Sequence, residues 1–149
     1  MKVLPSWDEA AATLTAYQER LTKATGTPAY DQAFRDSPPG VGVHEIDIEK
    51  IIRRVNPEEL KVLGYAENEL VGRPIFQFIV MQEASQRAIQ KKLTGGQTLT
   101  PFVRTFVRAG GSAVPMLLLD RYLTDRNGQV TGIRTALMEI AQDARERKA

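Results

Sequence analysis

The sequence predicts an α+β fold in which helices pack on an antiparallel sheet. Amphipathic helix patterns fill the first third of the chain, and short strand patterns come after them. In the last third, two glycine-containing turns join consecutive strands. This grouping of helices and strands, without strict alternation, favours an antiparallel sheet. With 149 residues, 42% of them hydrophobic and 26% charged, the chain has the composition of one globular domain.

The first predicted helix covers residues 7–25. Ser6 and Glu9 match a capping box at its start. Its apolar residues recur every three or four positions and form one stripe: Trp7, Ala10, Leu14, Tyr17, Leu21 and Ala24. Such a stripe must be buried, either on the same chain or on a second copy. The near-heptad spacing favours a homodimer, with the first five of these residues at the interface.

The middle of the chain combines short strands with short helices. A second short helix, "PAYDQAFRD", precedes two strand candidates, "VHEID" and "KIIRRVN". Three short helical pieces follow, "PEELKVLGY", "ENEL" and "RPIFQFI". The next helix is longer, and its apolar side is predicted to carry Met81, Ala84, Ala88, Ile89 and Leu93.

The last third predicts three strands. Gly110-Gly111 joins "TPFVRTFVR" to "AVPMLLLDRYL", and Asn127-Gly128, typical of a type I′ turn, leads into "QVTGIRTALMEI". The first of these strands carries phenylalanines on one side and valines on the other, so both faces of the sheet need cover. The helical insert can cover one face. The N-terminal helices, or a second subunit, can cover the other.

Residues from about Pro39 to Ile140 resemble the PAS domain family. The resemblance rests on "IIRRVNPEELKVLGYAENELVGRPIFQFI" and on "FVRTFVRAGGSAVPMLLLDRYLTDRNGQVTGI". It implies a five-stranded antiparallel sheet with short helices on one face. Residues 1–38 would form an N-terminal helical cap and dimerisation segment, residues 39–140 the PAS domain, and residues 141–149 a polar tail. The resemblance further implies a sensory or regulatory module in signal transduction, without catalysis, that acts with an effector domain or partner protein.

Several residues of the central motif have structural explanations. Asn56 suits a helix N-cap before Pro57, and Gly64 suits a left-handed helix end. Tyr65 is expected to pack its ring while its hydroxyl finds a partner. The turn after the first strand often contains glycine in the family, but it reads "DIEK" here.

The residue content excludes several chemistries. The chain has no cysteine, which removes disulfides, thiolate metal sites and cysteinyl-flavin photochemistry. His44 is the only histidine, so it is the only imidazole that could bind haem iron. A haem- or flavin-binding redox or gas sensor is therefore the alternative function, although neither cofactor is expected. A half-buried His44 bonded to a neighbour is the simpler interpretation. No metal site and no set of catalytic residues is expected.

If the domain is hollow, its ligand is expected to be small and mostly apolar. The same residues would equally form a solid core. The candidate lining residues are His44, Ile46, Val55, Leu60, Leu63, Phe76, Ile79, Ala88, Ile89, Phe102 and Leu119.

Charge and hydropathy limit the partners. A net charge of +2 without a clustered basic face predicts no nucleic-acid binding. No apolar run approaches the roughly 20 residues of a membrane span, and the first residues lack a signal-peptide pattern. We therefore expect a cytoplasmic protein that does not bind membranes.

Overall fold

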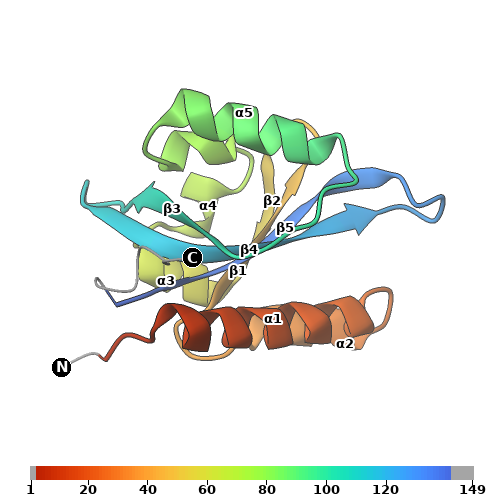
Figure 1. The fold of residues 1–149 in the computed structure, drawn as a ribbon, viewed down its shortest axis with the longest axis horizontal. Coiled ribbons are helices and arrows are strands. Elements are labelled where there is room, and N and C mark those ends of the chain that lie inside the picture. The colour runs from red at the N-terminus through yellow and green to blue at the C-terminus, as the bar shows by residue number, and fades with distance from the viewer. Residues whose placement is uncertain (1–2, 142–149) are drawn as a thin grey trace.

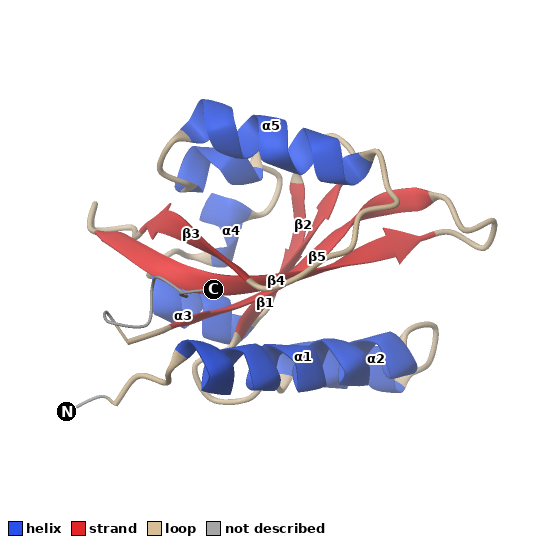
Figure 2. Ribbon diagram, viewed as in Figure 1, coloured by secondary structure: helices blue, strands red, loops and turns tan. Residues whose placement is uncertain are grey.

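A five-stranded antiparallel sheet lies between two layers of helices in the computed structural model, which describes residues 3–141 (Figure 1). The strand order across the sheet is β2-β1-β5-β4-β3. The helices α1 and α2 cover one face, called the outer face below, and α4 and α5 cover the inner face (Figure 2). This arrangement confirms the predicted fold class. The strands are β1 Gly42–Asp47, β2 Ile52–Val55, β3 Phe102–Val107, β4 Ala113–Thr124 and β5 Val130–Glu139.

The inner layer comes from the segment between β2 and β3. It contains α3 Pro57–Leu63, α4 Glu67–Leu70, the 3-10 helix η1 Ile75–Phe78 and α5 Gln82–Leu93. The Asn56 side chain accepts a hydrogen bond from the Glu59 N–H at 3.0 Å, which confirms the predicted N-cap. Gly64 ends α3 at φ 82°, and the Tyr65 hydroxyl donates to the Val107 carbonyl at 2.7 Å. The central motif therefore ties α3 to the sheet and to the end of β3.

The N-terminal layer consists of α1 Trp7–Ala24 and α2 Ala29–Arg35. The predicted capping box is present at Ser6 and Glu9. The apolar stripe of α1 packs against outer-face side chains of β1, β4 and β5: Val43, Leu117, Leu119, Ala136 and Met138. Among the described residues, no helix is long and apolar enough to cross a membrane.

The placement of the stripe corrects the predicted dimer interface. Ala10, Leu14, Tyr17 and Leu21 are at most 2% exposed, and Trp7 packs partly buried against the same cluster. The sheet of the same chain therefore covers these side chains, and they form no free face for a second copy. Near-heptad spacing produced the wrong interpretation because a helix on a sheet and a helix in a coiled coil need nearly the same apolar stripe.

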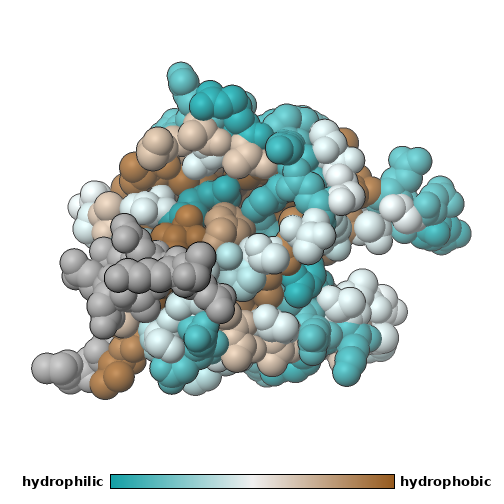
Figure 3. Space-filling view, in the orientation of Figure 1, coloured by the Kyte–Doolittle hydropathy of each residue, from teal (hydrophilic) through white to brown (hydrophobic). Residues whose placement is uncertain are grey.

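Helix α5 presents a narrower apolar side than predicted. Its buried residues are Ser85 and Ile89, whereas Ala84 and Ala88 are exposed. Met81 precedes the helix and is 73% exposed. Each helical residue turns the side-chain direction by about 100°, so the alanines one position before Ser85 and Ile89 lie on the flank of the helix, where they border hollows beside β3. In the space-filling view, hydrophilic residues predominate on this helical layer and on the tip of the β4–β5 hairpin (Figure 3).

The Asn127-Gly128 turn has a different geometry from the predicted type I′ turn, and in the Gly110-Gly111 turn only the second glycine has a positive φ. Gly111 and Gly128 have φ 95° and 78°, but the preceding Gly110 and Asn127 have no positive φ. Around the second turn, the Gly128 N–H donates to Asp125 O and the Asp125 N–H donates to Gln129 O. This is the pattern of a type I turn followed by a left-handed glycine. The Asp125 carboxylate stabilises it by accepting from the Asn127 and Gln129 N–H groups.

The glycine-free turn after β1 places a lysine in the left-handed region. Lys50 has φ 68°, and its N–H donates to Asp47 O at 2.9 Å. A residue with a side chain loses roughly 1 kcal/mol in this conformation, whereas glycine adopts it freely. We therefore expect Lys50→Gly to raise the free energy of unfolding by about 0.5 kcal/mol. Urea unfolding measures this change.

Lys50→Ala is the matched control. Both substitutions remove the hydrogen bond from Lys50 Nζ to Gln90 Oε1, but alanine leaves the backbone strain in place. Alanine should leave the stability unchanged or lower it. Equal effects of the two substitutions would show that the left-handed backbone costs nothing here.

Candidate ligand-binding site

A row of polar side chains crosses the centre of the otherwise apolar inner face. His44 on β1 lies opposite Thr135 on β5, and Thr135 lies opposite Asp120 on β4. All three residues are at most 5% exposed. The Thr135 hydroxyl donates to Asp120 Oδ1 at 2.6 Å. We call His44, Thr135 and Asp120 the inner polar row.

Helix α3 supplies a carboxylate to one end of this row. Glu59 is 1% exposed, and its two carboxylate oxygens lie 2.8 and 2.9 Å from His44 Nδ1. Gly42, two residues before His44, allows this approach. A Cβ atom at Gly42 would lie 2.6 Å from the Cβ of Glu59, closer than two carbons can pack. The buried pair therefore depends on glycine at position 42.

Helix α5 supplies an ammonium group to the other end. Lys92 Nζ donates to Asp120 Oδ2 at 2.7 Å and lies 3.7 Å from the centre of the Phe102 ring. Arg104 projects from β3 toward the same region, and its guanidinium carbon lies 4.9 Å from the Phe102 ring centre. Charges from α3, α5 and three strands thus converge on one part of the core.

The environment of His44 favours its protonated form. Burial alone would lower the pKa of His44, and Arg104 lowers it slightly further. The Glu59 carboxylate, helped by Asp120, outweighs both and raises the pKa above its ordinary value of 6.5. Burial lowers the pKa of Arg104, and Asp120 opposes that effect.

The raised pKa of His44 predicts a pH-dependent stability. A group with a raised folded-state pKa stabilises the fold fully below its unfolded pKa, and this stabilisation is lost as pH rises through the folded pKa. The free energy of unfolding should therefore decline as pH rises from about 6.5 through the folded-state pKa of His44. Urea midpoints measured between about pH 6 and 9 test this, in a chain with no other histidine and no cysteine.

Glu59→Gln provides the control for this pH profile. Without the carboxylate, burial becomes the dominant effect on the His44 pKa. The decline should disappear in this variant. An unchanged decline would assign the effect to another group.

The inner polar row borders a small internal cavity of about 10 Å³, measured as the space open to the centre of a water molecule. That volume suits about one water. Its polar wall consists of His44, Arg104, Asp120 and Thr135. Its remaining wall is apolar and consists of Ile46, Ile75, Ile79, Ile89, Phe106, Leu118 and Ile133.

A larger hollow of about 270 Å³ lies beneath the connection between α5 and β3. Arg104 and Asp120 line both this hollow and the internal cavity, so they stand between the two spaces. The other residues around the hollow are Ala88, Lys92, Gln97, Thr98, Leu99, Thr100 and Phe102.

The predicted lining residues divide into several groups. His44, Ile46, Ile79 and Ile89 line the internal cavity, whereas Ala88 and Phe102 line the larger hollow. Val55, Leu60 and Leu63 belong to the same inner core but do not line the cavity. For two residues the predicted position inside the cavity is wrong. Phe76 is partly exposed, and Leu119 packs on the α1 side of the sheet.

Both corrections have geometric reasons. The 3-10 turn η1 directs Ile75 and Phe78 inward, three residues apart, and leaves Phe76 between them. Leu119 lies in a continuous apolar run of β4, where sequence alone does not distinguish the two faces. Strand alternation places Leu118 and Asp120 inward and Leu119 outward.

Sequence reasoning identified His44 but missed the other polar residues at the site, among them Arg104 and Asp120. Arg104 is two positions before the buried Phe106, and Asp120 is two positions after Leu118. Strand alternation was therefore the available signal, because it assigns each polar residue to the same face as an apolar residue of the core.

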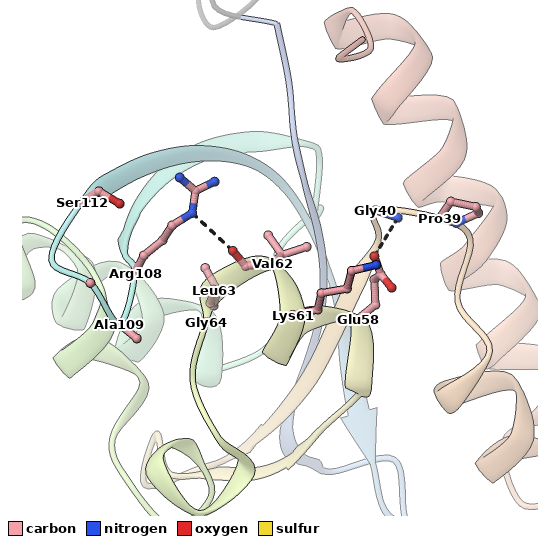
Figure 4. A pocket seen from close by; sticks show the side chains of 11 residues that line it. Pro39, Gly40, Glu58, Lys61, Val62, Leu63, Gly64, Arg108, Ala109 and Ser112 are labelled. Carbon is pink, nitrogen blue, oxygen red and sulfur yellow. Dashed lines mark hydrogen bonds between the residues drawn. The ribbon is translucent and has the colours of Figure 1, made fainter. Parts of the chain in front are cut away.

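A wider groove of about 800 Å³ lies elsewhere, between α3 and the β3–β4 turn (Figure 4). Arg108 is already used there: Nε donates to Val62 O at 3.3 Å and Nη2 to Glu139 at 3.1 Å. Glu58 accepts from the Gly40 N–H. The groove is open, and its charged groups are spread along it, so we place the candidate site at the inner polar row. Within residues 3–141, no group of histidine, aspartate and glutamate side chains could hold a metal ion.

On the outer face, a second buried polar cluster holds α1 on the sheet. Gln18 is fully buried, and its Nε2 donates to the carbonyls of Leu119 and Arg134 at 2.8 and 3.0 Å. Arg134 Nε donates to Gln18 Oε1 at 2.7 Å, and Nη2 donates to the Thr22 hydroxyl at 2.9 Å. The Tyr30 hydroxyl accepts from Arg134 and donates to Glu45. We call these residues the outer clamp.

Comparisons with known proteins agree on one family. A family model described as PAS domain matches residues 40–142. No curated protein matches the chain. The PAS domain of an HTR-like protein from Haloarcula marismortui superposes with a TM-score of 0.62 at 22% identity, covering 85% of this chain and 99% of that one.

Two further solved structures share the fold. The LOV protein of Rhodobacter sphaeroides has a TM-score of 0.61 at 18% identity, covering 86% of this chain and 69% of that one. The PAS domain of a LuxR-family transcriptional regulator from Burkholderia thailandensis, solved with ethanol, has a TM-score of 0.55 at 21% identity, covering 72% and 94%. PAS domains are generally sensory or signalling modules and not catalysts, and this chain belongs to the PAS domain family.

Proposed function

We propose that this chain is a sensory PAS module of signal transduction that binds a small molecule beside the inner polar row. The inner polar row itself carries this proposal. Buried ion pairs are often no more stabilising than apolar side chains of similar volume. A domain that needed only a solid core would therefore gain little stability from the inner polar row and its charged partners. Converging buried charges beside a cavity are instead typical of functional sites.

The signal would pass through the sheet to the N-terminal helices. Each residue of the inner polar row adjoins an outer-face residue that contacts those helices. Thr135 follows Arg134, Asp120 follows Leu119, and His44 precedes Glu45. The outer clamp holds all three of these neighbours, through Gln18 and Tyr30. A shift of the inner polar row would therefore change the geometry of the outer clamp.

The polar wall favours a small ligand with a polar group, in place of the mostly apolar ligand expected from the sequence. A neighbour of the same fold was solved with ethanol, a molecule of this kind. The hollow of about 270 Å³ beside the inner polar row lies below the usual range of about 300 to 1,000 Å³ for ligand pockets, which supports a ligand smaller than haem or flavin. The lack of cysteine also removes the residue that a cysteinyl-flavin adduct requires.

The visible absorption spectrum of the purified protein tests the cofactor alternative. A colourless preparation is expected. A Soret band that disappears in His44→Ala would instead assign a haem to the site and overturn the small-ligand proposal.

Native mass spectrometry of the purified chain, followed by denaturing analysis of any released molecule, tests ligand binding directly. Thermal unfolding with short alcohols, amides, amines and carboxylates extends the test to ligands lost during purification. We expect at least one class to raise the unfolding temperature and to change hydrogen exchange in α1. If no occupant is found and no class changes the unfolding temperature, the chain does not bind small molecules. Stabilisation without a change in α1 would contradict the signal path.

We further propose that the chain is a cytoplasmic homodimer that acts on an effector domain or partner protein. Because its own sheet covers the α1 stripe, the interface would use another surface, such as the exposed side of α1 around Ala12 and Ala16. Sedimentation of the wild type and of Ala12→Arg/Ala16→Arg tests this interface. A monomeric wild type would rule out the homodimer, and a dimeric variant would rule out this surface.

A further inference from the structure

Arg104 is the one cation at the candidate site that donates no hydrogen bond to a described residue. No carbonyl or carboxylate oxygen of the described residues accepts a hydrogen bond from its guanidinium, and its recorded contact is the face of the Phe102 ring. The side chain is only partly exposed. Arginine carries five N–H donors, and those of Arg104 are not among the buried side-chain atoms without a partner, so they remain open to water or to an entering ligand.

The surroundings of Arg104 leave space for an acceptor. Arg104 lines the internal cavity, the hollow of about 270 Å³ beneath residues 94–101, and a further hollow of about 280 Å³ at the start of α5. It therefore lies where an entering molecule would pass from the surface toward the inner polar row.

The charges around this position do not balance. Glu59 lies against His44, and Asp120 lies against Lys92, so the two carboxylates are each matched by a cation. Glu59 and Asp120 raise the pKa of His44 and so favour its protonated form. Arg104 adds a third cation, so the five groups carry one net positive charge when His44 is protonated. Asp120 is the carboxylate that acts on Arg104, but its two oxygens already accept hydrogen bonds from Lys92 and Thr135. A single negative charge would balance the group.

We propose that the ligand of this site is a small monocarboxylate whose carboxylate group is bound by the guanidinium of Arg104. This inference rests on the proposed sensory function and names the chemical class of the ligand. The planar fork of arginine matches the two oxygens of a carboxylate through paired hydrogen bonds. Lys92 lies beside the same hollow and adds positive potential.

The walls of the hollow favour a short apolar tail. Ala88, Leu99 and Phe102 line the hollow beside Arg104, and the isoleucines of the internal cavity lie on its other side. A phosphate monoester or a dicarboxylate would bring about two negative charges, one more than the net positive charge of the site with His44 protonated. The geometry therefore fits one carboxylate attached to a few carbons.

Calorimetric titration with propionate and propionamide tests the charge requirement. The two molecules have nearly the same shape and differ in charge. We expect propionate to bind the wild-type chain at least about tenfold more tightly, because hydrogen bonds to a charged group are the stronger ones. Arg104→Gln should weaken propionate binding by roughly tenfold to a hundredfold.

The matched control is Arg35→Gln. Arg35 is exposed at the end of α2, on the opposite side of the sheet, and the substitution removes the same charge. It should leave propionate binding unchanged.

Arg104→Lys serves as the second variant if Arg104→Gln does not fold, as judged by thermal unfolding. Lysine keeps the charge but loses the fork, so affinity should fall several-fold.

The outcomes separate this inference from the proposed function. Equal binding of propionate and propionamide, or propionate binding that survives both substitutions of Arg104, would overturn the carboxylate assignment and leave small-molecule sensing intact. Binding of short alcohols, without binding of any carboxylate from formate to butyrate, would also overturn the carboxylate assignment and leave small-molecule sensing intact. If no class of small molecule binds at all, both the inference and the proposed function are wrong.

Discussion

Leu14→Asp is expected to lower the free energy of unfolding by about 4 kcal/mol or more, because Leu14 is fully buried between α1 and the sheet. The substitution removes an apolar side chain from the outer core and brings a carboxylate into its place. Removal of a buried leucine side chain alone costs about 2 to 5 kcal/mol. Chemical denaturation followed by circular dichroism measures the change.

Glu19→Asp is the control on the same helix, and it keeps the charge of the surface. Glu19 is exposed, so an aspartate there should change the stability by only about 0.5 kcal/mol. The molecular mass in solution should be measured for both variants. If Leu14→Asp keeps the wild-type stability but turns a dimer into a monomer, the stripe packs between chains and its placement on the sheet of the same chain is wrong.

Asp120→Leu is expected to cost about 3 kcal/mol, because it breaks a buried ion pair and leaves Lys92 and the Thr135 hydroxyl without their acceptor. The Lys92 side chain is 15% exposed and borders the larger hollow, so water can solvate it in part. That solvation places the expected cost at the lower end of the range for broken buried pairs, which is about 3 to 5 kcal/mol. Urea unfolding measures it.

The double variant Lys92→Met/Asp120→Leu separates the ion pair from the packing. Apolar replacement of both partners is often neutral for a buried pair. We therefore expect the double variant to recover most of the stability lost in Asp120→Leu, with a large coupling energy in the double-mutant cycle. Additive effects of the two substitutions would show that Lys92 and Asp120 do not depend on each other.

Together these two sites describe how the domain is organised. Leu14 reports on the contact between the N-terminal helices and the outer face, and Asp120 reports on the inner polar row. Only the thickness of the sheet separates the two features. Leu119 and Asp120 are consecutive residues of β4, with one directed to α1 and the other to the cavity. A change on one face can therefore reach the other through the backbone of a single strand.

The sequence predicted the local elements well because local chemistry dictates them. Ser6 and Asn56 cap helices through side chains three residues from their partners, and the stripe of α1 follows the helical period. Turn geometry was less predictable. Asn127-Gly128 is compatible with more than one turn, and the hydrogen bonds of the Asp125 carboxylate accompany the form that is found.

The site was less predictable for a different reason. Its groups come from β1, β3, β4, β5, α3 and α5, and their positions depend on sheet register and on how closely each helix approaches. The His44–Glu59 pair requires a glycine at position 42, and the Lys92–Asp120 pair joins residues 28 positions apart. Neither contact has a signature in a window of sequence.

The sequence by itself therefore determined the order of the elements, their caps and the apolar stripe that α1 must bury, since these follow from propensity, periodicity and hydrogen bonds between near neighbours. The tertiary structure decided which surface covers that stripe, which strand face each residue of β4 occupies, and which charges meet in the core. These depend on register and long-range packing, in which one residue of displacement along a strand moves every side chain to the opposite face.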